Sequence, residues 1–221
     1  MTKNRSIILL SGGLDSLVSL GVAKEEYNIQ LALTFDYGQK SLKQEVEASK
    51  KITEFYEITH KIIELPFLKS ITNTALVSNE EVPTNDLKTK DSAKAVWVPN
   101  RNGLFLNIAA SYADSYEYTH VLFGANKEES ATFPDNSQEF VNAITNSFKY
   151  STMVQTKVVA PLISYNKNDI VRIALEHSIP LELARSCYNN GEINCGICES
   201  CIRLKSALQF NNANEYIERL F

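Results

Sequence analysis

An apolar run that leads directly into a glycine-rich turn is the feature that most constrains this fold. Ile7-Ile8-Leu9-Leu10 has no polar interruption, and Ser11-Gly12-Gly13 ends it. A short unbroken apolar run bounded by glycine is typical of a strand that is buried on both faces of a parallel sheet. Leu14, Val18 and Val22 then recur at helical spacing. The sequence therefore predicts a buried strand followed at once by a helix that ends near residue 26.

The rest of the chain alternates strand-like and helix-like segments. We expect strands at 29–35, 58–65 and 121–124, and helices at 42–56, 101–116, 138–150 and 169–177, with two more helices around the C-terminal cysteines and Asn211-Asn212. Ser41 is expected to cap the second helix, and Asp135 is spaced from Gln138 like a capping box. This alternation predicts an α/β fold with a parallel sheet and helices on both faces.

Ligands of such folds bind beyond the carboxyl ends of the strands. The loops at 11–16, 36–41 and 124–135 are therefore the expected site. Residues 70–95 are polar and aperiodic, and a loop of this length is typical of a lid.

Composition limits the class of protein. The chain has 221 residues, of which 44% are hydrophobic and 22% charged, which excludes a disordered tail. Its 26 acidic and 22 basic residues give a net charge of -4, which argues against non-specific nucleic-acid binding. We find neither a run of about 20 apolar residues nor the apolar core of a signal peptide, so we expect a cytoplasmic protein with reduced thiols and no membrane partner.

The turn at Ser11-Gly12-Gly13-Leu14-Asp15-Ser16 has the composition of a phosphate cradle. Two glycines let consecutive backbone amides converge on one anion at a helix N-terminus, and the serine hydroxyls add donors. The string matches neither a Walker A loop nor the dinucleotide-binding Gly-x-Gly-x-x-Gly pattern. An ordinary strand-to-helix turn with a capping serine is the alternative. Asp15 would hold Mg²⁺ or orient the loop.

The four cysteines of the chain lie at positions 187, 195, 198 and 201. Cys187, Cys195, Cys198 and Cys201 have the spacing C-x7-C-x2-C-x2-C, which suits a closed tetrahedral zinc site. A [4Fe–4S] cluster is the main alternative, but the ferredoxin pattern continues Cys-x3-Cys-Pro, which this chain lacks. Inert buried thiols are the third interpretation. No cysteine is left over for persulfide or thioester chemistry.

Several strings combine into a resemblance. SGGLDS resembles the PP-loop of ATP pyrophosphatases. Together, IILLSGGLDS, FDYGQK, VPNRNGLFLNIAASYA, GANKEES with FPD, and SCY-x6-CGICESC resemble the QueC family of 7-cyano-7-deazaguanine synthases over nearly the whole chain, in the same order. The resemblance implies a Rossmann-like (HUP/PP-loop) nucleotide-binding domain at 1–180 and a small C-terminal helical segment at 181–221 that holds a zinc site of four cysteines. It also implies a homodimer.

The resemblance implies an ATP-dependent C–N ligase that releases AMP. ATP would activate the carboxylate of 7-carboxy-7-deazaguanine as an acyl-adenylate, ammonia would displace AMP to give the amide, and a second ATP would convert the amide into the nitrile. The PP-loop would stabilise the departing pyrophosphate electrostatically. Cofactors would be structural Zn²⁺ and the Mg²⁺ that accompanies ATP.

The resemblance also assigns residues to these roles. Ser11, Asp15 and Ser16 would be catalytic, and the nucleotide loop would comprise Leu10, Ser11, Gly12, Gly13, Leu14, Asp15, Ser16 and Leu17. Substrate contacts would come from Tyr37, Gln39, Arg101, Asn102, Asp135 and Lys167, with Gly38 on the same rim. Structural alternatives stay open: a surface charge for Arg101, a helix cap for Asp135, a solvated side chain for Lys167 and packing for Tyr37. His60, His120 and His177 have no ligand partner at suitable spacing, and we expect structural roles for them.

Three departures from the family pattern fall on the acceptor side of the site. Ser41 stands where many members have histidine, Asn100 replaces a common glycine, and 131–137 differs from the usual SGYPDCR segment. These departures motivate the first of three rival functions. The enzyme could stop at the amide or use another amine, it could thiolate tRNA or add lysine to it, or the chain could be a non-catalytic nucleotide-binding module stabilised by zinc.

Overall fold

The computed structural model describes residues 3–78, 80 and 94–221. The strands are β1 (Asn4–Leu9), β2 (Tyr27–Asp36), β3 (Thr59–Glu64), β4 (His120–Leu122) and β5 (Lys157–Val159). The helices are α1 (Leu14–Ala23), α2 (Leu42–Tyr56), α3 (Phe67–Ile71), α5 (Arg101–Ser115), α6 (Lys127–Ser130), α7 (Gln138–Ser151), α8 (Lys167–Glu176), α9 (Glu199–Phe210) and α10 (Asn214–Leu220), with 3₁₀ turns η1 (Pro134–Asn136) and η2 (Leu181–Leu183).

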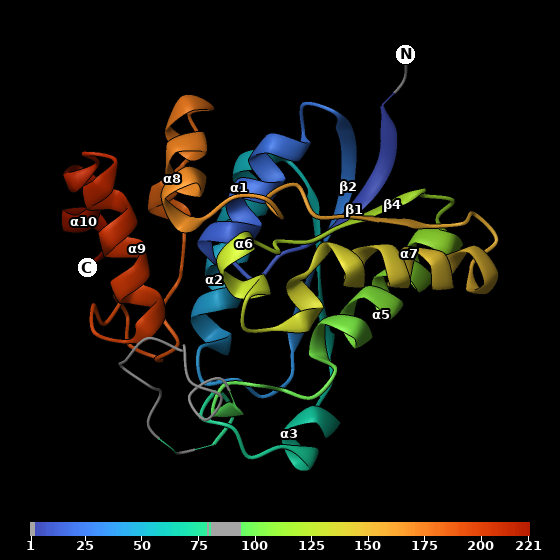
Figure 1. Cartoon of the computed structure of the whole chain (residues 1–221), viewed down its shortest axis with the longest axis horizontal. Helices are drawn as coiled ribbons and strands as arrows, with labels where there is room; N and C mark the ends of the chain where they lie inside the picture. Colours follow the sequence, from blue (N-terminus) through green and yellow to red (C-terminus); the bar gives the residue numbers. More distant parts are fainter. Residues whose placement is uncertain (1–2, 79, 81–93) are drawn as a thin grey trace.

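The strands form one parallel sheet in the order β3-β2-β1-β4-β5, around which the helices are arranged (Figure 1). β1 is central because Ile7 pairs with Leu31 of β2 on one side and with Val121 of β4 on the other. The chain crosses from β3 at one edge to β4 beside β1. This reversal is the switch point at which α/β sheets bind ligands.

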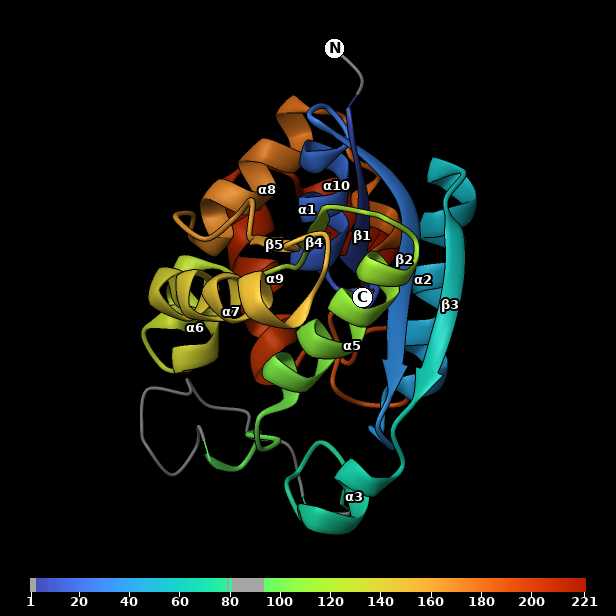
Figure 2. The same ribbon diagram turned by 90° about the vertical axis from the view of Figure 1, so that its right-hand side faces the viewer.

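Helices cover both faces of the sheet (Figure 2). Because side chains alternate along a strand, Ile7 and Leu9 pack with α5 and α7, whereas Ile8 and Leu10 pack with α1, α2 and α8. The second cluster continues into α9 and α10, so apolar residues on both sides of residue 180 share one core. The predicted fold class is confirmed, and the division at residue 180 stays a prediction.

Most predicted elements are present, and their bounds shift by a few residues. The sequence missed β5, which has only three residues, and the short helices α3 and α6. About half of the expected lid at 70–95, namely residues 79 and 81–93, lies outside the described residues. Within the described part of that range, Ser70 and Ile71 belong to α3.

Of the two predicted caps, the one at Asp135 is wrong, and the one at Ser41 is confirmed in position but makes no hydrogen bond to the helix backbone. Ser137, not Asp135, is the N-cap of α7, and its Oγ accepts a hydrogen bond from the amide of Phe140. Asp135 lies within η1. Ser41 occupies the N-cap position of α2, but its hydroxyl donates to Glu45 instead of accepting from the helix backbone. Ser137 is nearer than Asp135 to the first turn of α7, and the Ser41 hydroxyl is directed at the Glu45 carboxylate.

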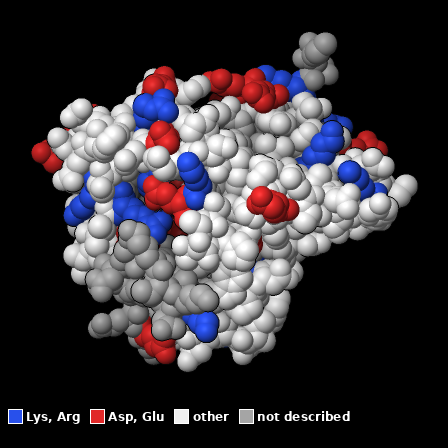
Figure 3. Space-filling view, in the orientation of Figure 1, with Lys and Arg blue, Asp and Glu red and all other residues white. Residues whose placement is uncertain are grey.

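No helix in the described ranges is long and apolar enough to cross a membrane. On the face seen in Figure 3, basic and acidic side chains are interspersed over a largely uncharged surface.

Candidate active site

The nucleotide loop lies where β1 meets α1. Gly12 has φ +76°, and a Cβ added there would lie 2.8 Å from the Cβ of Ala48 and 2.9 Å from the carbonyl oxygen of Glu45. Only glycine fits this close approach of the loop to α2. The Ser16 hydroxyl donates to the Gly13 carbonyl at 3.0 Å and lies 3.3 Å from the Ser11 hydroxyl, so the hydroxyls line the same turn.

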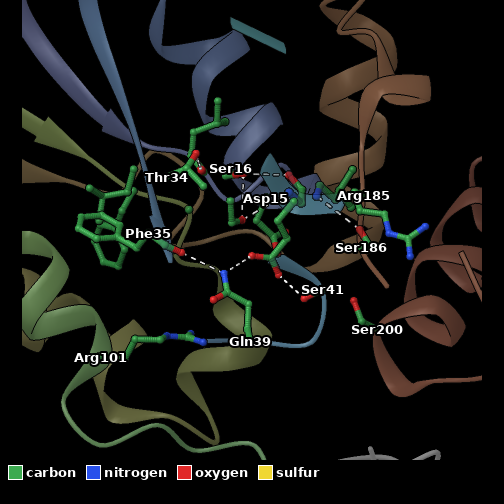
Figure 4. A pocket seen from close by; sticks show the side chains of 18 of the residues that line it. Asp15, Ser16, Thr34, Phe35, Gln39, Ser41, Arg101, Arg185, Ser186 and Ser200 are labelled. Carbon is green, nitrogen blue, oxygen red and sulfur yellow. Dashed lines mark hydrogen bonds between the residues drawn. The ribbon is translucent and has the colours of Figure 1, made fainter. Parts of the chain in front are cut away.

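A cavity of about 230 Å³ opens over this loop, and Figure 4 shows its labelled walls. It brings together all but one of the predicted contact residues, namely Tyr37, Gln39, Arg101, Asn102 and Lys167. The exception, Asp135, lines a second cavity of about 100 Å³. The two cavities share Leu76, Arg101, Glu129, Asn136 and Tyr188. The second cavity contains Trp97 and Phe133, whose rings stack with centroids 5.8 Å apart.

Asp15 and Lys167 form a buried ion pair at the edge of the loop. The Lys167 Nζ lies 2.5 Å from Asp15 Oδ2 and 3.6 Å from Glu129 Oε1. Burial raises the pKa of Asp15, and Lys167 opposes that shift. Burial also lowers the pKa of Lys167, but Asp15 and Glu129 outweigh it, so that the net shift is upward. Asp15 Oδ1 is buried without a hydrogen-bond partner among the described residues, which fits an oxygen that a cation would ligate.

Arg101 begins α5 and extends into the cavity (Figure 4). It donates to the Tyr37 hydroxyl at 3.3 Å, and its guanidinium lies 5.7 Å from the centre of that ring. Arg101 also acts electrostatically on Asp135. Burial raises the pKa of Asp135, and the guanidinium opposes that shift without cancelling it. Arg101 thus joins both cavities and is not a surface charge.

Glu45 also lines the cavity, although it was not predicted from the sequence. Ser41 Oγ donates to Glu45 Oε1 at 2.6 Å, and Gln39 Nε2 donates to Glu45 Oε2 at 2.8 Å; dashed lines mark both bonds in Figure 4. Burial raises the pKa of Glu45. Its position one turn after Ser41, on the side of α2 that buries Ala48, Ser49 and Ile52, was the signal available in the sequence.

Arg185 and Ser186, which were not predicted either, cover the loop from the C-terminal segment. The Arg185 amide donates to the Gly12 carbonyl at 2.7 Å, and the Leu14 amide donates to Ser186 Oγ at 3.4 Å. The Arg185 guanidinium donates to the carbonyls of Asn189, Gly191 and Glu192. No local pattern reveals contacts across more than 170 residues of chain.

The four cysteines converge on one point. Their Sγ atoms all lie within 4.8 Å of one another, and Cys195 and Cys201 are 3.9 Å apart. Gly196 makes the turn between the ligands with φ +75°. Backbone amides point at the sulfurs, since Cys195 N donates to Cys187 Sγ and Cys198 N donates to Cys195 Sγ, both at 3.3 Å. This donor set fits a tetrahedral metal ion.

The pKa values of the thiols also indicate a metal site. Hydrogen bonds from Cys198 and Cys201 lower the pKa of Cys187, and the bond to Cys187 raises the pKa of Cys198 to about 11. Sulfurs this close cannot all be thiolates unless a cation balances their charge, which a bound metal provides.

Comparisons with known proteins identify the family of this chain. The family model described as queuosine biosynthesis protein QueC matches residues 5–212. A 7-cyano-7-deazaguanine synthase of Carboxydothermus hydrogenoformans is 49% identical over 209 residues, covering 92% of this chain and 97% of the relative. The 7-cyano-7-deazaguanine synthase of Methanosarcina barkeri is 47% identical over 230 residues, covering 98% and 99%.

Solved structures show the fold alone. The U34-tRNA thiolase NcsA of Methanococcus maripaludis, solved with its [4Fe–4S] cluster, has a TM-score of 0.54 at 15% identity, covering 100% of this chain and 71% of that one. A 4-thiouridine synthetase in complex with RNA and ATP has a TM-score of 0.50 at 18% identity, covering 99% and 53%. On the sequence comparisons, this chain belongs to the QueC family of queuosine biosynthesis proteins.

Proposed function

We propose that this chain is an ATP-dependent C–N ligase that converts 7-carboxy-7-deazaguanine and ammonia into 7-cyano-7-deazaguanine. The observation that carries the proposal is the Ser11–Ser16 loop at the floor of a cavity that also contains Arg101 and Lys167. Family membership supplies the substrate class.

The nucleotide loop would receive the phosphates of ATP. Backbone amides of the turn and the hydroxyls of Ser11 and Ser16 are the donors available to the leaving pyrophosphate. Lys167 is the adjacent cation. Mg²⁺, held by Asp15, would supply further charge neutralisation on the phosphates.

We assign to Arg101 the orientation of the substrate carboxylate. A guanidinium matches a carboxylate through paired hydrogen bonds, and Arg101 lies where the nucleotide cavity and the second cavity meet. We assign the heterocycle to the second cavity, where Trp97 and Phe133 offer ring faces and Asp135 offers an acceptor. The substrate carboxylate would then attack the α-phosphorus, pyrophosphate would leave, and the acyl-adenylate would form. Ammonia would displace AMP to give the amide, which a second ATP would convert into the nitrile.

We assign structural Zn²⁺ to the four cysteines. A Zn–S distance of about 2.3 Å requires sulfurs about 3.8 Å apart, close to the separation of Cys195 and Cys201. A [4Fe–4S] cluster places four irons and four sulfides between its cysteines and needs a wider cage than 4.8 Å. The metal would be measured by elemental analysis of anaerobically purified protein, in which iron and visible absorbance would overturn the assignment. A homodimer in the cytoplasm stays a prediction.

The test is mass spectrometry of a reaction that contains the metal-loaded protein, Mg-ATP, 7-carboxy-7-deazaguanine and ammonium. We expect the nitrile together with AMP. AMP with only the amide or a conjugate would move the function to an amide-forming or amine-transferring ligase. Turnover that requires tRNA would favour tRNA modification, and the absence of AMP would contradict the activation chemistry.

Asp15→Ala and Ser16→Ala are expected to abolish AMP formation while the protein stays folded.

A further inference from the structure

Glu45 is a half-buried carboxyl in the nucleotide cavity to which the proposed reaction so far gives no task. It lies in the first turn of α2 and lines the cavity beside the loop. Its backbone oxygen is the atom that a Cβ at Gly12 would meet at 2.9 Å. The described groups that act on its charge are Arg101 and Arg185, and Glu45 itself acts on Tyr37. Glu45 therefore shares the cavity with the nucleotide loop and is within electrostatic reach of Arg101.

A purely structural role leaves the charge of Glu45 unexplained. Gln39, its partner, is already fixed without it: Gln39 Nε2 donates to the Phe35 carbonyl at 2.9 Å, and Gln39 Oε1 accepts from the Tyr37 amide at 3.0 Å. A neutral side chain could also accept a hydrogen bond from Ser41. Burial of a carboxylate costs free energy, and carboxyls whose pKa is perturbed by burial cluster at functional sites.

The contacts orient Glu45 rather than neutralise it. Ser41 and Gln39 each hold one carboxylate oxygen, and each oxygen keeps a further lone pair. Neither partner is a cation, so the carboxylate stays available as a proton acceptor. Burial moves the pKa of Glu45 upward, toward the range in which a general base is most effective, while the two hydrogen bonds and the charges of Arg101 and Arg185 oppose that shift.

We propose that Glu45 is the base that takes the proton from the attacking nitrogen when ammonia displaces AMP. The nitrogen lone pair forms the C–N bond with the acyl carbon, and the nitrogen becomes positively charged. A Glu45 carboxylate oxygen accepts one N–H proton, the bond between the acyl carbon and the phosphate oxygen breaks, and AMP leaves with the electron pair. Glu45 then returns its proton to solvent. The proposal rests on the proposed function.

The experiment separates adenylate formation from amide formation in Glu45→Gln. The protein, Mg-ATP and 7-carboxy-7-deazaguanine are mixed with either ammonium or hydroxylamine at neutral pH. Hydroxylamine is largely unprotonated there and traps an acyl-adenylate as the hydroxamate. Its oxygen makes the N–H proton of the adduct more acidic than that of the ammonia adduct, so water takes this proton and no enzyme base is needed. We expect Glu45→Gln to keep hydroxamate formation within about threefold and to lose about 10²- to 10⁴-fold in amide formation, the usual contribution of a general base.

Both products are measured on one preparation, so their ratio does not depend on the fraction of folded protein. Glu45→Asp keeps a carboxylate and is expected to lie between wild type and Glu45→Gln. Glu47→Gln, a change elsewhere on the same helix, is the matched control and should behave as wild type. Equal loss of both products in Glu45→Gln, or loss of neither, would overturn the proposal. Failure of wild type to give hydroxamate would instead overturn the activation chemistry itself, and the proposal with it.

Discussion

The backbone amide of Arg185 donates a 2.7 Å hydrogen bond to the carbonyl of Gly12. Two residues further along the chain, Cys187 joins the sulfur cluster. Ser186, between them, accepts from the Leu14 amide. The cysteine segment and the nucleotide loop are therefore held together by direct contacts, and a change in the first should reach the second.

Metal removal is expected to weaken nucleotide binding as well as stability. Without the metal, the segment that carries Arg185 and Ser186 loses its anchor at Cys187, since binding energy at such a site is folding energy. We expect a lower Tm and a rise of about tenfold in the Kd of a non-hydrolysable ATP analogue, about 1.4 kcal/mol. Thermal unfolding gives the Tm and calorimetric titration gives the Kd, each measured before chelation, after chelation and with zinc added back.

Ser186→Ala provides the same test with all four cysteines intact. Loss of the acceptor for the Leu14 amide should cost about 1 kcal/mol, typical of one hydrogen bond, and should raise the Kd severalfold. Ser186→Thr keeps the hydroxyl and should restore affinity. An unchanged Kd in both the chelated protein and Ser186→Ala would show that the two sites are independent.

Gly12→Ala is expected to destabilise the protein. The new Cβ would face Ala48 at 2.8 Å at a φ of +76°, and the left-handed conformation alone costs a non-glycine residue about 1–2 kcal/mol. Urea unfolding measures the loss. Gly191→Ala is the control, because its added Cβ would lie 3.4 Å from the Ile193 carbonyl oxygen, an ordinary van der Waals contact. Equal stabilities of the two variants would contradict the packing argument.

Lys167→Met leaves Asp15 buried without its cation. Removal of one partner from a buried pair costs about 3 kcal/mol, and we expect this loss at pH 8. At pH 5 the loss should be smaller, because burial has already raised the pKa of Asp15 and a protonated carboxyl needs no cation. Urea unfolding at both pH values measures the change, and Lys149→Met, an exposed change on α7, is the control. A loss that does not depend on pH would show that Asp15 is not the cause.

The contribution of His60 to the free energy of unfolding should be smaller at acidic pH than at neutral pH. The Thr34 hydroxyl donates its only proton to the Leu10 carbonyl at 2.6 Å. His60 Nε2 lies 2.8 Å from the same hydroxyl oxygen and must therefore be the donor of the bond between them. Burial lowers the pKa of His60, and Lys50 adds to the shift. The folded state thus favours the neutral ring, whose contribution is full above about pH 6.5 and is lost as the pH falls through the folded pKa.

His60→Leu removes this donor and should cost about 1 kcal/mol at pH 7.5. Urea unfolding at pH 7.5 and pH 5 should give a smaller difference from wild type at the lower pH. A difference that grows on acidification would refute the sign of the shift.

Sequence patterning predicted those parts of the fold that bury a regular face. β1 and α1 are specified by an unbroken apolar run and by a helical repeat, and both are present. β5 was missed because three residues carry too little periodicity, and only pairing with β4 makes them a strand. The predicted cap at Asp135 failed because Ser137 is nearer to the helix.

The site divides in the same way. The nucleotide loop and the four cysteines are short motifs, and their residue spacing was enough to predict a phosphate-binding turn and a metal site. Glu45 and Arg185 carry no such spacing: one acquires its role from burial against Gln39, and the other from a contact with Gly12 far along the chain. Lys167 was predicted as a contact residue, but its pairing with Asp15 is a product of tertiary structure.

The central place of β1 has a consequence during synthesis. Its fully buried Ile7 and Ile8 gain one neighbour from β2 early, but the other edge waits for β4, more than 110 residues later. At roughly 5–20 residues per second, a ribosome needs on the order of ten seconds to make that stretch. Throughout that interval the middle of the future sheet is an open apolar edge, which makes the nascent chain, rather than the finished enzyme, the form most exposed to aggregation and to capture by chaperones.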